Sequence, residues 1–542
     1  MSRKSSLLIV TLIVCIVLLG SYFALAAPRP KELSANQIPS GGSITYSDQR
    51  TPAGYDVHKI WDSHLDVIMQ NVLECLVYEH PTTHEIVPGL ATEWEISPDG
   101  KVYTFKLRKD VKFHDGTPFD AYAVKKTYDR YSDSRIASPS FMGLFGSNYL
   151  GTEVIDKYTV QIKFSAPFAP FIVNLGESFC GIISPATLDK YPEDIGSHIS
   201  GTGPFMVKEV VPKDHITLVR NENYHGHAPA FYKHQGKAYL DSVTFKHITE
   251  ESTRVAALQT GDLDIIRAPW MMVKDYEVAP GVYTVAVGNP GPPGRTDITC
   301  DRWPTDDQKV RQALLFYVNR DEMLKAPFYG GAIWAEDGPL TKGFWTRSEK
   351  AAAMYSYNLA KGDTLLIEAG WKKNKAGIWE KNGKQLEIVI ITEATPPFLT
   401  ASEILTGQFK RAGIVTKIRS ADTQAAWAMA RNGEGNLVPY ADTATDPDSL
   451  FAAYHSSGIG ISDMFTRITI PELDSLLEKG RMTTDRSERE KIYQRIQEII
   501  MEQALTIPLY NSARIYAVKD RVRGINFNNR AGMLMYDAYI SK

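Results

Sequence analysis

The chain has 542 residues, of which 43% are hydrophobic and 23% charged, the composition of an ordinary globular protein of about two to four domains. Its 60 basic residues against 63 acidic ones give a formal net charge of −3. This small negative net charge gives no electrostatic reason to expect nucleic-acid binding.

The first 26 residues differ from the rest of the chain. Arg3 and Lys4 precede an uncharged run over 7–19, and Ala24-Leu25-Ala26 puts small residues at the −3 and −1 positions of a cleavage site. This order is typical of a secretory signal peptide, and the mature chain would start near Ala27. The alternative is an uncleaved membrane anchor, because the segment approaches the ~20 residues that span a bilayer. Both interpretations predict a periplasmic or otherwise extracytoplasmic protein.

Three cysteines remain after such cleavage: Cys75, Cys180 and Cys300. An odd number leaves at least one thiol free, and the sequence leaves open whether the other two form a disulfide. Their apolar neighbours favour buried thiols that behave as small hydrophobic side chains.

The N-terminal half predicts a strand at 42–47, a helix within 60–77, a helix at 122–132 and a strand at 158–164, with a loop over 135–150. Between them, 82–121 predicts a β-meander. Tyr103, Phe105 and Leu107 alternate with polar residues there, and Asp99-Gly100 and Asp115-Gly116 are typical turn signals. In Gly201-Thr-Gly-Pro-Phe205, two glycines and a proline indicate special backbone angles.

A proline- and glycine-rich stretch at 288–305 indicates a domain boundary, and the chain after it is more regularly α/β. Apolar spacing predicts helices at 310–318, 359–369 and 404–412, the last ended by Gly413. Asn382-Gly383 predicts a hairpin. Ser487 and Glu490 fit a capping box that opens another helix.

The motifs of common enzyme classes are absent from the sequence. It contains no G-x-S-x-G, H-E-x-x-H or G-x-x-x-x-G-K-[ST] pattern. His225, His227 and His234 fall within ten residues, but no cysteine or paired carboxylate has metal-ligand spacing beside them. We therefore predict no catalytic residue, no metal and no cofactor, and a protein that is not an enzyme. Aromatic residues in loops between domains favour a ligand cleft.

Several blocks resemble, in order, the large solute-binding proteins of ABC importers, the peptide/nickel-binding family (family 5). The clearest is VPGLATEWEISPDGKVYTFKLRKDVKFHDGTPF at 87–119. The others are GTGPF (201–205), LVRNENY (218–224), YLDSVTF (239–245), RVAALQTGDLDI (254–265), VRQALLFYVNRDEML (310–324), EAGW (368–371), DPDSL (446–450) and IPLYNSARIYAV (507–518). Together they cover essentially the whole mature chain.

The resemblance implies a mixed α/β (α+β), bilobed periplasmic-binding-protein-like fold with an extra domain inserted in lobe I. Lobe I would take 27–79, 199–287 and 506–542 after a signal peptide or anchor at 1–26, with the inserted domain at 80–198. Lobe II would take 288–505. The solute binds between the lobes, which close by a hinge, and the closed form docks on membrane permease subunits. A monomer is expected.

The resemblance also places candidate ligand-binding residues. In peptide-binding members, an Asp three residues before the Asp-Pro of DPDSL pairs with the peptide's α-ammonium. That position is Thr443 here, with Asp442 just before it and Tyr440 where a Trp is usual. A desolvated ammonium needs an anion, so either Asp442 serves or the solute has no free amine there. Which of Asp442 and Thr443 faces the ligand stays open.

Other loops face the cleft in the family's plan. Thr423 stands where dipeptide binders carry a Trp, and Ser47 and Arg50 follow the first strand. Arg50 would pair with an anionic group of the solute and Glu393 with a cationic one.

A peptide is the leading solute class. An oligosaccharide, stacked on Tyr440 and Trp334, is the nearest alternative, and a nickel or metal-chelate ligand comes next. A secreted hydrolase is a remote alternative from a different class.

Overall fold

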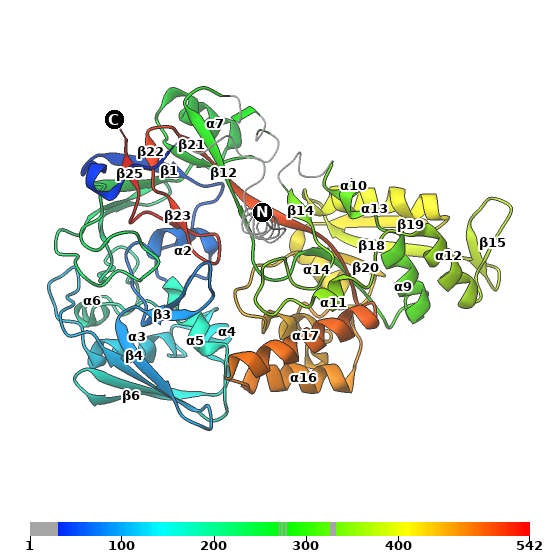
Figure 1. The fold of residues 1–542 in the computed structure, drawn as a ribbon, viewed down its shortest axis with the longest axis horizontal. Helices are drawn as coiled ribbons and strands as arrows, with labels where there is room; N and C mark the ends of the chain where they lie inside the picture. The colour runs from blue at the N-terminus through cyan, green and yellow to red at the C-terminus, as the bar shows by residue number, and fades with distance from the viewer. Residues whose placement is uncertain (1–30, 270–271, 273–274, 277–278, 326–331, 542) are drawn as a thin grey trace, which may run out of the picture.

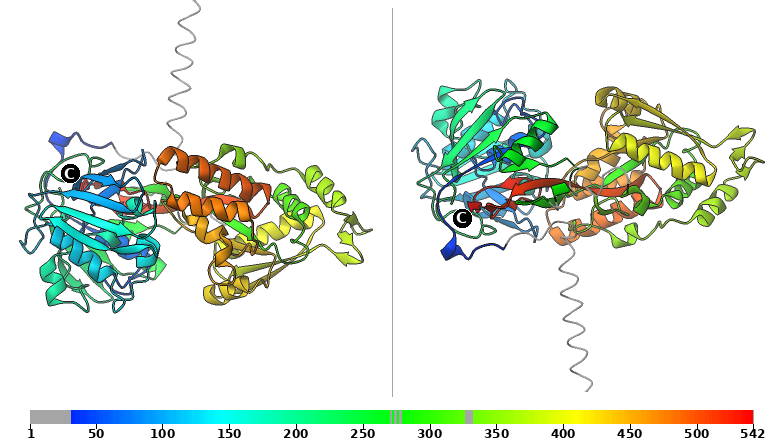
Figure 2. Two further views of the ribbon diagram at one scale, coloured as in Figure 1. Left: turned by 90° about the horizontal axis from the view of Figure 1, so that it is seen from below. Right: turned by 90° about the horizontal axis from the view of Figure 1, so that it is seen from above.

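The computed structural model describes residues 31–269, 272, 275–276, 279–325 and 332–541 (Figure 1). The predicted signal peptide or anchor lies outside the described residues. Two bodies stand side by side, and the long strand β21 (Thr506–Lys519) runs from one into the other, as the views at right angles also show (Figures 1 and 2). We call the body on the left of Figure 1 lobe I and the body on the right lobe II.

One mixed sheet passes through both lobes, in the strand order β19-β18-β20-β13-β21-β11-β1-β10-β9-β8. The first half of β21 pairs with β13 and β14 of lobe II, and its second half pairs with β11 and β12 of lobe I. The two lobes therefore share one central strand. The partners change between Ser512, the last residue paired with β14, and Ala513, the first paired with β12.

Lobe I is built from segments that are far apart in the sequence. Its elements outside the four-stranded sheet are η1 (Ala35–Gln37), β1 (Ser43–Ser47), α2 (Ser63–Met69), β2 (Val77–Glu79), β3 (Ile86–Pro88), β8 (Phe205–Val211), β9 (His215–Arg220), β10 (Ser242–Lys246), α7 (Glu251–Thr260), β11 (Ile265–Arg267), β12 (Val282–Gly288), β22 (Val522–Arg523), β23 (Asn526–Phe527), β24 (Met533–Leu534) and β25 (Tyr539–Ile540).

A separate four-stranded antiparallel sheet, in the order β4-β5-β7-β6, completes the lower part of lobe I (Figure 1). Its region comprises β4 (Ala91–Ile96), β5 (Val102–Leu107), α3 (Ala121–Tyr131), α4 (Phe141–Phe145), β6 (Tyr149–Asp156), β7 (Thr159–Phe164), α5 (Phe171–Asn174), η2 (Ser178–Cys180) and α6 (Pro185–Lys190). The predicted alternation in β5 is confirmed, because Tyr103, Phe105 and Leu107 are all buried.

Lobe II packs helices around the other end of the shared sheet. Its elements are β13 (Gly294–Ile298), α9 (Gln308–Tyr317), α10 (Arg320–Met323), β14 (Ala332–Ala335), α11 (Glu349–Ala352), α12 (Leu359–Glu368), β15 (Lys372–Lys373), β16 (Trp379–Lys381), β17 (Lys384–Gln385), β18 (Glu387–Glu393), α13 (Phe398–Ala412), β19 (Val415–Ala421), α14 (Thr423–Arg431), β20 (Leu437–Tyr440), α15 (Ser449–Tyr454), η4 (Ser456–Gly458), α16 (Pro471–Met482) and α17 (Arg486–Glu502).

The structure confirms the mixed α/β class and several local predictions. Helix α13 ends at Gly413, whose φ of +89° places it in the left-handed region that glycine tolerates. Asn382 and Gly383 have φ of +53° and +73° and join β16 to β17, as predicted for a two-residue hairpin. Cys75, Cys180 and Cys300 are buried free thiols.

Two local predictions were wrong, and a third was confirmed over a shorter range. Helix α17 is capped by Asp485, whose carboxylate accepts from the Glu488 amide at 2.8 Å, and not by Ser487. The helix predicted within 60–77 ends at Met69, because the chain then turns toward β2. The predicted loop over 135–150 contains α4, where Phe141 and Phe145 stack at 5.0 Å.

The glycines of GTGPF serve close packing and not unusual backbone angles. A Cβ on Gly201 would lie 2.2 Å from the Val72 carbonyl oxygen, and one on Gly203 would lie 2.7 Å from the same atom. The Gly203 amide donates to that carbonyl at 3.0 Å. The segment 201–205 therefore packs closely against the turn that follows α2.

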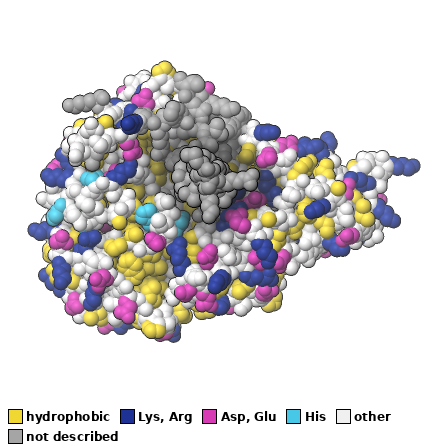
Figure 3. All heavy atoms as spheres, in the orientation of Figure 1, with side chains coloured by type: hydrophobic (Ala, Val, Ile, Leu, Met, Phe, Trp, Pro, Cys, Tyr) yellow, Lys and Arg dark blue, Asp and Glu magenta, His cyan; other side chains and the backbone are white. Residues whose placement is uncertain are grey.

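Acidic and basic side chains are interspersed over both lobes on the face drawn in Figure 3, in keeping with the net charge of −3. Within the described residues, no helix combines the length and the apolar character needed to cross a bilayer.

The lobes also touch away from β21, where α16 and α17 approach the α4–α5 region (Figure 1). The Ala169 amide donates to the Arg481 carbonyl at 2.8 Å. The Arg481 guanidinium lies 5.9 Å from the ring centroid of Phe168 in lobe I and 3.5 Å from that of Phe451 in lobe II. Arg481 thus links the two lobes through its backbone and its side chain.

We expect Arg481→Ala to shift the protein toward a more open arrangement of the lobes. The variant loses a cation–π contact between the lobes, worth about 0.5–1 kcal/mol, and the population of closed molecules falls accordingly. Small-angle X-ray scattering should give a larger radius of gyration than for the wild type. Arg495→Ala is the matched control, because Arg495 pairs with Glu472 and Glu502 inside lobe II. Scattering curves that coincide for R481A and the wild type would contradict the expectation.

Candidate functional site

The segment that follows β20 is held against β13 by a buried group of charges. Arg295 of β13 is opposite Tyr440 of β20 in the sheet. Its Nε donates to Asp297 Oδ1 at 3.1 Å, and its Nη1 lies 3.5 Å from Asp442 Oδ2. The guanidinium also lies 5.1 Å from the centroid of the Tyr440 ring. One guanidinium, 2% exposed, therefore faces two carboxylates.

Asp442 carries the unbalanced charge of this group. Its side chain is 29% exposed, whereas those of Arg295 and Asp297 are buried. Within the described residues, Asp442 Oδ1 is buried without a hydrogen-bond partner, as are Nη1 and Nη2 of Arg295. Burial raises the pKa of the Asp442 carboxyl above its ordinary value, although Arg295 acts in the opposite direction. A hydrogen-bond donor would satisfy this oxygen, and a cationic donor would also balance the negative charge of the carboxylate.

Tyr440 is fixed from several sides. Its hydroxyl donates to Asp463 Oδ2 at 2.9 Å, and its ring contacts Trp427 and Phe465 with centroid distances of 5.9 and 5.4 Å. The Arg295 guanidinium also contacts the Tyr440 ring. Tyr440 therefore forms part of the support of Asp442.

Glu393 and Thr423, predicted separately, contact each other. Thr423 Oγ1 donates to Glu393 Oε2 at 2.7 Å, and Trp427 Nε1 donates to Glu393 Oε1 at 3.1 Å. Trp427 lies one turn after Thr423 on α14, so a Trp does reach this region although Thr423 stands at the expected position. It links Glu393 to Tyr440.

The residues after Asp442 are also anchored. The Ala444 amide donates to the Pro290 carbonyl at 3.1 Å. Asp446 and Arg489 form a buried two-point ion pair, with distances of 2.7 and 2.6 Å. Thr443 is half-buried and directly precedes the first of these anchors. The segment 440–446 is therefore rigidly placed on lobe II.

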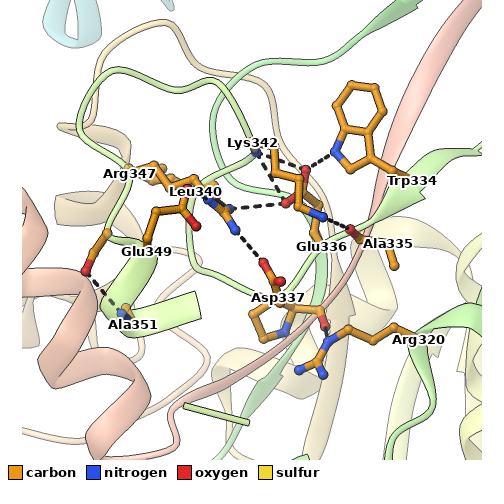
Figure 4. Close-up of polar contacts among 12 residues, drawn as sticks. Arg320, Trp334, Ala335, Glu336, Asp337, Leu340, Lys342, Arg347, Glu349 and Ala351 are labelled. Carbon is orange, nitrogen blue, oxygen red and sulfur yellow. Dashed lines mark hydrogen bonds and ion pairs between the residues drawn. The ribbon is translucent and has the colours of Figure 1, made fainter. Parts of the chain in front are cut away.

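Trp334 lies on β14 beside the shared strand, where it pairs with Asn511. Its indole Nε1 donates to the buried Glu336, which also accepts from the Lys342 amide at 3.1 Å and from Arg347 Nη1 at 3.2 Å (Figure 4). These contacts fix the ring next to the shared strand β21.

The predicted lobe I residues differ in exposure. Ser47 is fully buried and accepts from the Ile248 amide at 3.4 Å, whereas Arg50 is exposed. Between them, Asp48 accepts from the Tyr46 hydroxyl at 2.5 Å and lies 3.3 Å from His64 Nε2. The loop after β1 is thus fixed through Asp48, which sequence reasoning did not single out.

The histidines at 225, 227 and 234 do not converge. His227 Nε2 lies 3.1 Å from Glu74 Oε2, and His234 Nδ1 lies 2.7 Å from Asp537 Oδ1. Among the described residues, no group of three or more metal-ligating side chains is present.

Sequence reasoning missed Arg295, Asp297 and Trp427. The first two stand two residues apart in a strand whose five residues are all buried, but they fall within the stretch at 288–305 whose prolines and glycines indicated a domain boundary. Charged residues are seldom fully buried unless they are paired.

We expect the Asp48–His64 contact to make stability depend on pH. Burial lowers the pKa of His64, but hydrogen bonds to Asp48 and Asp62 outweigh it and raise the pKa to about 9. The folded value exceeds the unfolded value of about 6.5, so the stabilisation is complete below pH 6.5 and is lost as the pH rises through about 9. His64→Gln should lower the free energy of unfolding by up to about 3 kcal/mol at pH 6, and by much less at pH 9.5.

Urea unfolding at several pH values measures this difference. His225→Gln is the control, since His225 is exposed and its ring contacts the Asn223 carbonyl. A gap between the wild type and H64Q that stays constant from pH 6 to 9.5 would rule the interpretation out.

Comparison with known proteins gives one consistent result. A sequence profile described as "Bacterial extracellular solute-binding proteins, family 5 Middle" matches residues 85–460, more than half of the chain. The chain is 30% identical over 464 residues to a glutathione-binding protein of Pectobacterium atrosepticum, covering 81% of this chain and 83% of that protein. It is 27% identical over 519 residues to heme-binding protein A of Haemophilus influenzae, covering 90% of each.

A solved structure agrees with these sequence matches. The periplasmic binding protein DppA of Helicobacter pylori, in complex with the peptide STSA, superposes with a TM-score of 0.71 and 26% identity. The match covers 94% of this chain and 99% of that one.

Proposed function

Since the chain belongs to the family 5 extracellular solute-binding proteins of bacteria, we propose that its solute is a peptide with a free α-ammonium group, held between the lobes at Asp442. Members of the family bind small solutes and work with the permease subunits of ABC transporters. This protein is a solute-binding component of that kind, in a family of binding proteins and not of enzymes. In our proposal it acts as a monomer, catalyses no reaction and hands the peptide to its permease.

The observation that carries the proposal is the unbalanced charge at Asp442. Arg295 is shared with Asp297, so the two carboxylates exceed their cation by one charge. Asp442 Oδ1 has no partner in the described part of the chain. A peptide ammonium supplies the missing positive charge and the missing donor in one group, and a neutral sugar hydroxyl supplies only the donor.

Tyr440 also favours a peptide over an oligosaccharide. Stacking on a sugar needs an open aromatic face, and Arg295, Trp427 and Phe465 already contact this ring. In our proposal Tyr440 and Glu393 support the site, and Asp442, not Thr443, contacts the solute.

Native mass spectrometry of the purified protein tests the solute class. A closed binding protein that retains its solute should show an added mass that disappears on denaturation, and tandem fragmentation should give peptide ions. An added mass that fragments as a hexose oligomer, or that carries the isotope pattern of nickel, would contradict a peptide.

We expect Asp442→Ala to weaken peptide binding by about 2–5 kcal/mol, or about 30- to 5,000-fold in Kd, since the ammonium loses its buried anion. Isothermal titration calorimetry with the retained peptide measures the loss. Thr443→Ala is the matched control, one residue further along the same segment, and should leave Kd within about threefold. The reverse pattern, with T443A weak and D442A unaffected, would move the anchor to Thr443.

A further inference from the structure

A small cavity lies where lobe I meets the segment 440–446 of lobe II. Its volume is about 30 Å³, room for about two water-sized groups. Lobe I provides most of the wall through α2, β2, the residues after α5 and the β23–β24 hairpin, and Thr445 closes it from lobe II. In Figure 1, α2, α5 and β23 lie on the side of lobe I that faces lobe II.

Three carboxylates line this cavity: Asp66, Glu79 and Glu177, each less than 8% exposed. Asp66 Oδ1 accepts from the Ser178 hydroxyl at 2.7 Å. Glu79 accepts from Asn529 and lies 2.8 Å from His84 Nδ1. These two carboxylates are therefore held by neighbours in lobe I.

Glu177 is different. Its Oε1 pairs with Arg530, and its Oε2 is buried without a hydrogen-bond partner among the described residues. The Glu177 side chain is 5% exposed. A buried carboxylate oxygen without a donor costs free energy, and this cost is removed when a donor enters the cavity.

The wall carries too little positive charge for its carboxylates. Among the described residues that line the cavity, Arg530 is the one cation, and it faces three carboxylates. Burial raises the pKa of both Glu79 and Glu177, although His84 and Arg530 act in the opposite direction, and the nearby carboxylates Asp446 and Asp66 add to the rise. A cation inside the cavity would relieve this repulsion.

Aromatic rings complete the lining. Tyr78 and Tyr232 border the cavity, and Phe231 packs edge-on against Tyr78 with a centroid distance of 6.0 Å. Rings attract cations through their negative faces and leave a neutral polar group poorly solvated. The volume fits a compact head group and excludes a bulky side chain.

We propose that this cavity binds a primary ammonium on a side chain of the solute, which donates to Glu177 Oε2. The inference rests on the proposed peptide function and narrows it to peptides with a basic residue of the lysine type. The cavity is made from both lobes, because Thr445 closes a wall otherwise built from lobe I. The side-chain ammonium is therefore enclosed when the lobes meet, while Asp442 holds the α-ammonium.

Matched tripeptides test the cavity. Lysine or norleucine is placed at each position of an alanine tripeptide, so that the members of a pair differ only in the terminal ammonium. Isothermal titration calorimetry on the wild type should show at least a tenfold preference for lysine at one position. In Glu177→Gln, which keeps the shape and removes the charge, this preference should fall to within twofold.

Glu95→Gln is the control, an exposed glutamate on β4 of the same lobe, and should keep the full preference. Asp66→Asn, which removes a neighbouring charge, replaces E177Q if thermal melting shows that E177Q does not fold. Equal binding of lysine and norleucine peptides at every position overturns the cavity inference and leaves the peptide function standing. A preference that survives E177Q also overturns it, and failure of every tripeptide to bind removes both proposals together.

Discussion

The shared strand β21 is the constraint on which the rest of the structure depends. Its first half completes the sheet of lobe II and its second half completes the sheet of lobe I. The apolar cores of the two lobes remain separate, with two clusters in lobe I and three in lobe II among the described residues. We therefore expect a hinge between the lobes to lie near Ser512 and Ala513, where the partners of β21 change.

Each lobe brings an incomplete carboxylate to the region between them. Asp442 in lobe II and Glu177 in lobe I each have one buried oxygen without a partner among the described residues. Each lies beside one guanidinium, and in each group the carboxylates outnumber that guanidinium. Such groups destabilise an empty protein, and natural proteins keep them where a ligand completes them. If both proposals hold, the two sites make the affinity of the protein depend on positive charge in the solute.

Local patterns in the sequence predicted the elements whose causes are local. The alternation in 102–107, the apolar spacing in 310–318 and the glycine at 413 each gave the observed element. The cap of α17 failed because Asp485 and Ser487 both fit a cap pattern, and which one is used depends on where the helix packs. Counting back from the DPDSL block directed attention to Tyr440 and Asp442, which the structure places against Arg295.

The remaining parts of the candidate site depend on long-range pairing. Arg295 meets Asp442, 147 positions away, and Arg530 meets Glu177 across 353 positions. A single sequence carries no periodicity that reports such pairs. Arg295 and Asp297 also fall within the proline- and glycine-rich stretch at 288–305, so only the structure shows that they lie in a fully buried strand.

The place of β21 in the order of the chain has a consequence for biosynthesis. Residues 506–519 follow every other strand of lobe II and all but four short strands of lobe I. A chain that emerges from its N-terminus first lacks the central strand of both lobes until it is nearly complete. Closing these sheets joins residues hundreds of positions apart, which makes the step intrinsically slow. The strand that joins the two lobes thus also keeps a growing chain from completing either sheet early.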